Sequence, residues 1–79
     1  MEWNEKLAAE YRESALKIKS RIDELTEQIN ERFRQIKARP DYRGWTDGET
    51  GRLLRRRAAL RKLYGDTIYT AHLLEHYYD

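Results

Sequence analysis

The first half of the chain repeats apolar residues at the spacing of an α-helix. Between about residues 4 and 38 they recur every three or four positions, which is the period of a helix with one apolar face. The stripe is roughly 80° wide, closer to a coiled-coil seam than to the broader face of a globular helix. We therefore predict one long helix here, with Asn4 as its N-cap. Its apolar stripe comprises Leu7, Tyr11, Ala15, Ile18, Ile22, Leu25, Ile29, Phe33 and Ile36.

The helical pattern stops just before Pro40. A proline restricts the backbone of the preceding residue and lacks the amide that would continue a helix. Residues that favour turns follow, and then a T-D-G-E segment matches the capping box S/T-x-x-E. In this motif Thr46 and Glu49 would each bond an amide near the other. The sequence thus predicts a loop over residues 39–46 and a second helix over about residues 47–78.

A second apolar stripe runs along this helix and stays in phase from one end to the other. Gly65 and Asp66 offer a place where the helix could end and a third helix could be capped. The apolar spacing nevertheless continues across them, which favours one continuous helix over two shorter ones. The stripe comprises Leu53, Leu60, Tyr64, Ile68, Ala71, Leu74 and Tyr78.

The two stripes match when the helices run antiparallel. In such a hairpin the numbers of facing residues add up to a nearly constant total. Ile22 would face Tyr64 at a total of 86, and pairs towards both ends of the helices give 85 or 86. The sequence therefore predicts an all-α fold, with residues 1–79 forming a single domain built as a long antiparallel helical hairpin.

A hairpin of two helices has one seam and no interior. Chains of this size seldom gain more than roughly 3–5 kcal/mol from their core, and the absence of cysteine rules out a disulfide. We therefore predict a homodimer in which two coiled-coil-like hairpins form a four-helix bundle. The alternatives are a monomer with scattered exposed aromatics and a different protein bound at the same residues. The candidate interface residues are Trp3, Leu63, Tyr69, Leu73 and Tyr77.

Charge is sorted along the predicted hairpin. The chain carries a net charge of +2, but residues 32–62 hold eleven basic and three acidic residues, which leaves +8 there and −6 elsewhere. Arginine suits phosphate recognition, so the end with the turn is a candidate nucleic-acid-binding surface. The candidate contacts are Arg39, Arg43, Arg52, Arg55 and Arg56.

The alternative for this basic region is a salt-bridged face. The register of the hairpin would place Glu31 near Arg55. It would also place Glu24 near Arg61 or Lys62. Such pairs would neutralise about half of the positive patch, although exposed pairs contribute little stability.

The C-terminal part of the chain contains one motif that resembles a catalytic signature. Residues 72–76 read H-L-L-E-H, which matches the H-x-x-E-H pattern of some zinc proteases. His72 and His76 share a helical face, but the sequence ends three residues later and we expect no third ligand downstream. A two-helix rod also has no concave pocket. We therefore expect no enzyme, no metal, no cofactor and no small-molecule substrate.

Two further observations bear on location. No apolar run is long enough to span a membrane, and the acidic N-terminus lacks the apolar region of a secretory signal. We expect a cytoplasmic, non-catalytic interaction protein that acts as an adaptor, regulator or inhibitor by binding another macromolecule. The alternative is a nucleic-acid-binding accessory protein that uses the arginine-rich turn end.

Overall fold

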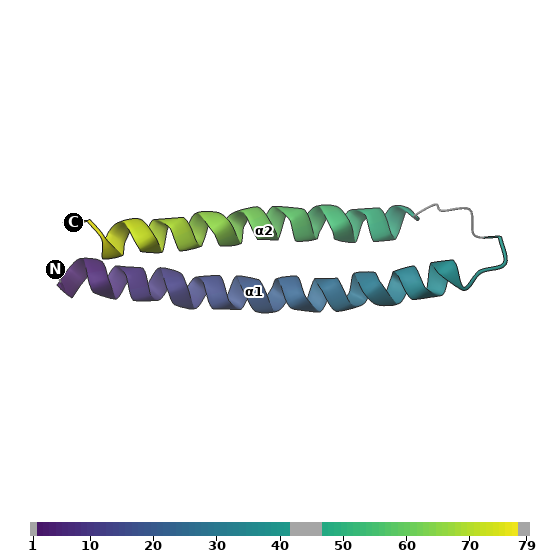
Figure 1. The fold of residues 1–79 in the computed structure, drawn as a ribbon, viewed down its shortest axis with the longest axis horizontal. Coiled ribbons are helices and arrows are strands. Elements are labelled where there is room, and N and C mark those ends of the chain that lie inside the picture. The colour runs from purple at the N-terminus through teal and green to yellow at the C-terminus, as the bar shows by residue number, and fades with distance from the viewer. Residues whose placement is uncertain (1, 42–46, 78–79) are drawn as a thin grey trace.

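Two helices make up the fold in the computed structural model, which describes residues 2–41 and 47–77. Helix α1 spans Glu2–Lys37 and helix α2 spans Gly48–Glu75. They lie antiparallel and in contact, and they form a rod of 61 × 15 × 15 Å (Figure 1). We call the end where α1 begins and α2 finishes the open end, and the opposite end the turn end. The predicted all-α hairpin is confirmed.

The start of α1 differs from the prediction. The helix begins at Glu2, so Asn4 is its third residue and its side chain is buried. The prediction of Asn4 as N-cap is therefore wrong. At the other end α1 closes at Lys37, and the Arg39 amide donates to the Ile36 carbonyl at 3.1 Å just before the proline.

Helix α2 is capped by Asp47. This residue has an extended backbone, with φ −73° and ψ 165°, and its Oδ1 accepts a hydrogen bond from the Thr50 amide at 2.7 Å. The predicted capping box is therefore wrong, because aspartate one position later is an equally good cap. Thr46 lies outside the described residues, and so does Tyr78 at the other end. The helix passes Gly65 without a break, as predicted, and ends at Glu75.

The seam between the helices is one layer deep. The described residues have their buried apolar side chains almost entirely on α1, at Ala8, Ala15, Ile22, Leu25, Ile29 and Ile36, with Ala71 from α2. The predicted seam residues of α2 that face them are otherwise half-buried. Tyr11, also predicted in the seam, is 37% exposed. The stripes thus lie where the sequence placed them, but they enclose little.

The rod shape leaves a large surface. The chain exposes 6179 Å², whereas a compact monomer of 9.6 kDa would expose about 5,100 Å². The difference follows from packing two long helices side by side with nothing on their outer faces. Within the described part of the chain, neither helix carries an apolar stretch that could cross a lipid bilayer.

Candidate interaction surface

Arg32 joins the two helices near the turn end. Its Nε donates to the Thr50 Oγ1 at 3.0 Å, and its Nη2 contacts the Asp47 Oδ2 at 2.9 Å and the Glu49 Oε2 at 3.1 Å. Thr50 has no exposed surface, so this hydroxyl is satisfied inside the seam. Arg32 is thus part of the scaffold, and its charge is not available to an external ligand.

The same contacts act on the carboxylate of Asp47. Hydrogen bonds from Thr50, through its side chain and its amide, and the nearby charge of Arg32 lower the pKa of Asp47 from 3.8 to about 2. Both effects favour the ionised carboxylate over the protonated form. Asp47 therefore stays negative over the physiological range and holds the first turn of α2 against α1.

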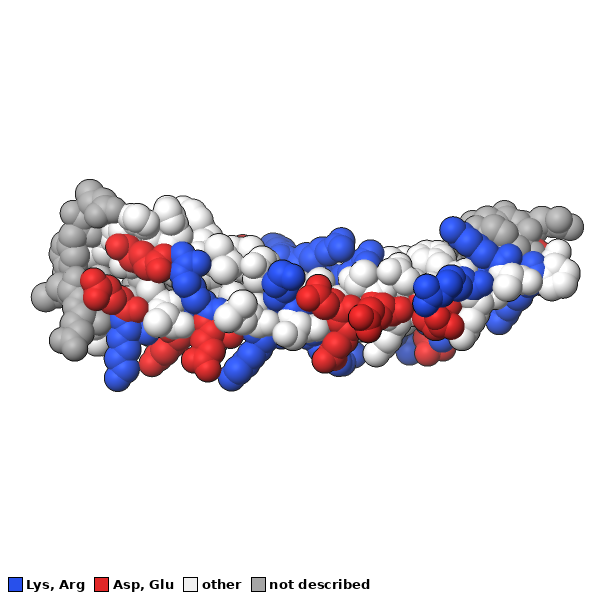
Figure 2. Space-filling model, turned by 60° about the horizontal axis from the view of Figure 1, so that its bottom comes forward, with Lys and Arg blue, Asp and Glu red and all other residues white. Residues whose placement is uncertain are grey.

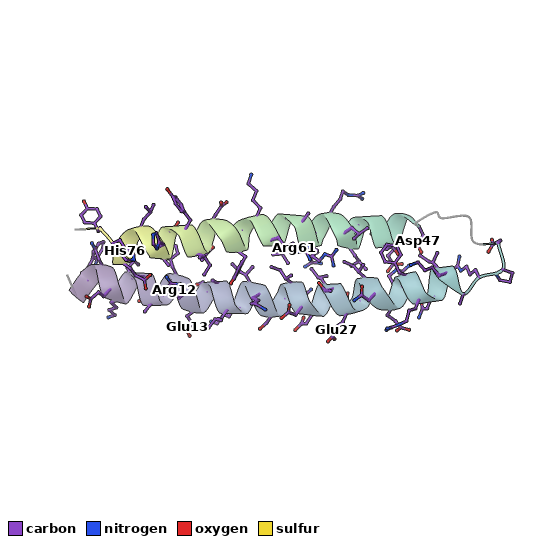
Figure 3. All side chains as sticks on the ribbon, viewed as in Figure 1. Arg12, Glu13, Glu27, Asp47, Arg61 and His76 are labelled. Atoms are coloured by element: carbon purple, nitrogen blue, oxygen red, sulfur yellow. The ribbon has the colours of Figure 1, made fainter. Side chains whose placement is uncertain are left out.

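A second cross-helix ion pair closes the open end. The Nε of Arg12 donates to the Glu75 Oε2 at 2.9 Å, and its Nη2 donates to the Oε1 of the same carboxylate. The hydrogen bond from Arg12 lowers the pKa of Glu75, and its partner carboxylate raises the pKa of Arg12. Arg12 and Asp47 lie towards opposite ends of the rod, both beside the facing helix (Figure 3). The two helices are thus joined by charged contacts at both ends.

The H-x-x-E-H motif is divided by this ion pair. Its glutamate, Glu75, turns towards α1, while His72 and His76 remain exposed with ring centroids 4.4 Å apart. Across residues 2–41 and 47–77, no group of three or more His, Cys, Asp or Glu side chains is placed to hold a metal ion. The two histidines and Glu75 thus do not point towards a common site.

The first half of α2 carries five exposed basic residues: Arg52, Arg55, Arg56 and Lys62 on adjoining sides of the helix, and Arg61 on the opposite flank. We call these five residues the basic stripe. Within the described residues, none of the five lies within 4.0 Å of a carboxylate. Their neighbour Arg57 turns inward instead, and its Nη1 donates to the Thr26 Oγ1 at 3.3 Å. The stripe is therefore an uncompensated positive surface.

The predicted salt bridges across the hairpin are wrong. Glu31 pairs with Arg34 at 2.5 Å, and Glu24 pairs with Arg21 at 2.9 Å, both on α1 itself. Residues three positions apart on one helix are neighbours, whereas a partner such as Arg55 lies on the outer side of α2. Acidic and basic side chains are accordingly intermixed on the face that brings α1 forward (Figure 2).

The structure brings together only some of the candidate phosphate contacts. Arg52, Arg55 and Arg56 lie within two turns of α2, in the basic stripe. Arg39 lies beyond the end of α1 and is exposed. Arg43 lies outside the described residues. Among the described residues, the candidate arginines that lie close together are therefore all on α2.

All five candidate protein-interface residues are exposed. Trp3 of α1 is 70% exposed, and Leu63, Tyr69, Leu73 and Tyr77 are between 49% and 66% exposed. Tyr69 and Leu73 each lie two positions from the buried Ala71, so helical geometry turns them away from α1. We call this side of α2 its outer face. Their role in binding a protein stays a prediction.

A groove lies between the two helices near the turn end. It has a volume of about 800 Å³, is open to solvent, and runs between residues such as Gln28 and Gln35 of α1 and Leu53 of α2. Its charged lining includes Arg32 with Glu49, and Arg34 with Glu31, which are already paired. Such a surface suits contact with a broad partner better than enclosure of a small molecule.

The contacts of Arg32 were not predicted from the sequence. In the sequence, Arg32 is one of eleven basic residues in the region 32–62, and nothing marks it as a partner of Thr50. A signal existed in the D-x-x-T spacing of Asp47 and Thr50, which is typical of an N-cap and its N3 residue.

Comparison with known proteins found no matching family model, no similar curated protein and no similar solved structure.

Proposed function

We propose that this chain is a non-catalytic interaction protein, an adaptor, regulator or inhibitor, that works as a homodimer of helical hairpins. The observation that carries the proposal is the exposure of Leu63, Tyr69, Leu73 and Tyr77 on a helix pair with only one buried seam. Tyrosine is favoured at interfaces because it buries a large ring and keeps a polar tip. A second hairpin on this side of α2 would give a four-helix assembly with a thicker core.

Sedimentation equilibrium over a concentration series tests the dimer. We expect a mass twice that of the 9.6 kDa chain at tens of micromolar. The double variant Tyr69→Ser/Leu73→Ser should sediment as a monomer with unchanged helicity, because it removes apolar surface that the hairpin itself does not bury. Leu16→Ser, which alters an exposed leucine on α1, is the matched control and should remain dimeric. A wild-type monomer at these concentrations would contradict the proposal.

Affinity capture from the native host, followed by mass spectrometry, tests the partner. We expect one macromolecule to be enriched by the wild-type chain in the presence of nuclease, because the exposed apolar residues favour a protein. The Tyr69→Ser/Leu73→Ser variant should lose or weaken that enrichment. Enrichment that disappears on nuclease treatment would instead favour the second candidate function.

The second candidate is nucleic-acid binding, and the basic stripe favours it. Five exposed cations without a carboxylate neighbour among the described residues can neutralise phosphates independently of sequence. Binding of this kind should weaken steeply between low and moderate salt. The double variant Arg52→Ala/Arg56→Ala should reduce the slope of log affinity against log salt by about 0.9 for each phosphate that is no longer neutralised.

A matched control separates the stripe from net charge. The double variant Lys6→Ala/Lys17→Ala removes the same charge from α1, and it should leave the salt slope nearly unchanged if the stripe makes the contacts. Labelled duplex DNA, single-stranded DNA and single-stranded RNA are the probes. Failure of all three to bind at low salt would contradict nucleic-acid binding.

A further inference from the structure

The outer face of α2 carries a complete heptad pattern. Eight exposed residues follow one another at alternating steps of three and four, which is the spacing of the contact positions in a coiled coil. The first half of this series holds three basic residues, and the second half holds its two large apolar side chains. In order, the residues are Arg52, Arg55, Ala59, Lys62, Asp66, Tyr69, Leu73 and His76.

The charges at the centre of this series are uncommitted. Lys62 and Asp66 are four positions apart, a spacing that often gives an ion pair, yet they form none with each other. Neither has another oppositely charged side chain within 4.0 Å in the described part of the chain. Both are exposed, so each is available to an opposite charge on a second molecule.

We propose that a second copy of this chain packs its α2 antiparallel on this face, in the register where the numbers of facing residues total 128. The proposal rests on the homodimer proposed above and specifies its contact surface. Lys62 of each copy then faces Asp66 of the other, which gives two ion pairs about a two-fold axis near residue 64. A closed two-fold pairing of this kind uses the same surface on both copies.

Two further facing pairs fit the same register by shape. Tyr69, the largest side chain of the series, faces Ala59, the smallest. Leu73 faces Arg55, whose aliphatic stem can cover an apolar side chain while its guanidinium reaches water. Leu63 lies on the flank beside the axis and meets Leu63 of the second copy. Three of the exposed apolar side chains of α2 therefore leave water together.

Other pairings of the two outer faces are less favourable. A parallel arrangement would place Arg55 against Arg55 and Lys62 against Lys62, and like charges at facing positions repel. An antiparallel arrangement centred on Leu73 would overlap only the last turns of the helices and leave Lys62 and Asp66 without partners. Charge complementarity thus selects one orientation and one register.

A charge-swap mixing experiment tests the register. Lys62→Asp places negative charge at both central positions, and Asp66→Lys places positive charge at both. Each variant alone should therefore dimerise at least about tenfold more weakly than the wild type. An equimolar mixture should form mainly the heterodimer, because both contacts become attractive between chains while each helix keeps its like charges. Native mass spectrometry distinguishes the species, and circular dichroism checks that each variant stays helical.

Cross-linking supplies an independent readout, since the chain has no cysteine of its own. Leu63→Cys should give a covalent dimer with a short bis-maleimide. Leu73→Cys should not, because the two copies of that position would be about 27 Å apart along the helices. A dimer that cross-links at position 73 and not at 63, or a charge-swap mixture with only the statistical share of heterodimer, would overturn the register. A wild-type monomer would instead overturn the homodimer, and the register with it.

Discussion

The Nε of Arg32 lies 3.0 Å from the Oγ1 of Thr50, a side chain with no exposed surface. This hydrogen bond places a polar contact inside a seam that is mostly apolar. It also connects α1 to the N-terminal turn of α2, where Asp47 caps the helix. The register at the turn end is therefore held by several directional contacts, whereas the middle of the rod relies mainly on apolar packing.

Replacing Arg32 with methionine should destabilise the hairpin. The change removes the donor to the buried Thr50 oxygen and the two carboxylate contacts of Arg32, so we expect the free energy of unfolding in urea to fall by about 1–3 kcal/mol. Adding Thr50→Val to this variant should recover part of the loss, because no oxygen is then buried at position 50 without the donor that Arg32 supplied. Arg34→Met is the control, since Arg34 pairs only within α1 among the described residues. An equal loss in both single variants would refute the role given to Arg32.

Acid should weaken the turn end through Asp47. The pKa of Asp47 is about 2 in the folded chain and lower than its ordinary value of 3.8, so the folded state binds this proton less readily than the unfolded state. Its contribution to stability is complete above about pH 4 and is lost as the pH falls towards 2. Melting curves of wild type and Asp47→Asn should differ most near pH 5 and converge near pH 2. A difference that does not change with pH would contradict the lowered pKa of Asp47.

The thin seam makes the buried leucine critical. Leu25 is 1% exposed, and truncating such a residue to alanine costs about 2–5 kcal/mol. That loss is comparable to the whole stability expected of a core this small, so Leu25→Ala should be largely unfolded by circular dichroism at 25 °C. Leu16→Ala removes the same atoms from a side chain that is 64% exposed, and it should change stability by less than about 0.5 kcal/mol. A folded Leu25→Ala chain would show that the packing lies elsewhere.

Replacing Gly65 with alanine should stabilise α2. A Cβ built at this helical position meets nothing within 4 Å, and alanine loses less conformational entropy than glycine on folding. Gly65→Ala should therefore raise the free energy of unfolding by about 0.5–1 kcal/mol, measured in urea at low micromolar concentration. The reverse change at the exposed Ala58, to glycine, should lower it by a similar amount. No gain at position 65 would indicate that α2 is bent there.

The two helices could be predicted because the signal for them is repeated many times. Nine apolar positions in α1 agree on one period, so an error at any one of them does not change the fold. The proline at position 40 ends the pattern for a local reason that is independent of packing. The antiparallel pairing followed from matching the two stripes. The helices and their pairing could be predicted because many residues contribute to each signal.

The ends of the helices and the ion pairs could not be predicted in the same way, because each depends on competition between near neighbours. Asp47 and Thr46 are both good caps, and only the backbone path decides between them. The sequence offers Glu31 basic residues on both helices, and in the structure it pairs with one on its own helix. The spacing of apolar residues along α2 predicts that Tyr69 and Leu73 face away from α1. That spacing does not identify the molecule that binds them.

The rod consists of two uninterrupted helices, and its far ends are separated by its full length of 61 Å. The two ends also differ in chemistry, with tyrosines towards one and arginines towards the other. If one macromolecule bound the tyrosine end and another bound the arginine end, the rod would act as a rigid spacer and fix the distance between them. Lengthening both helices by one heptad should then move such partners about 10 Å further apart without altering either contact.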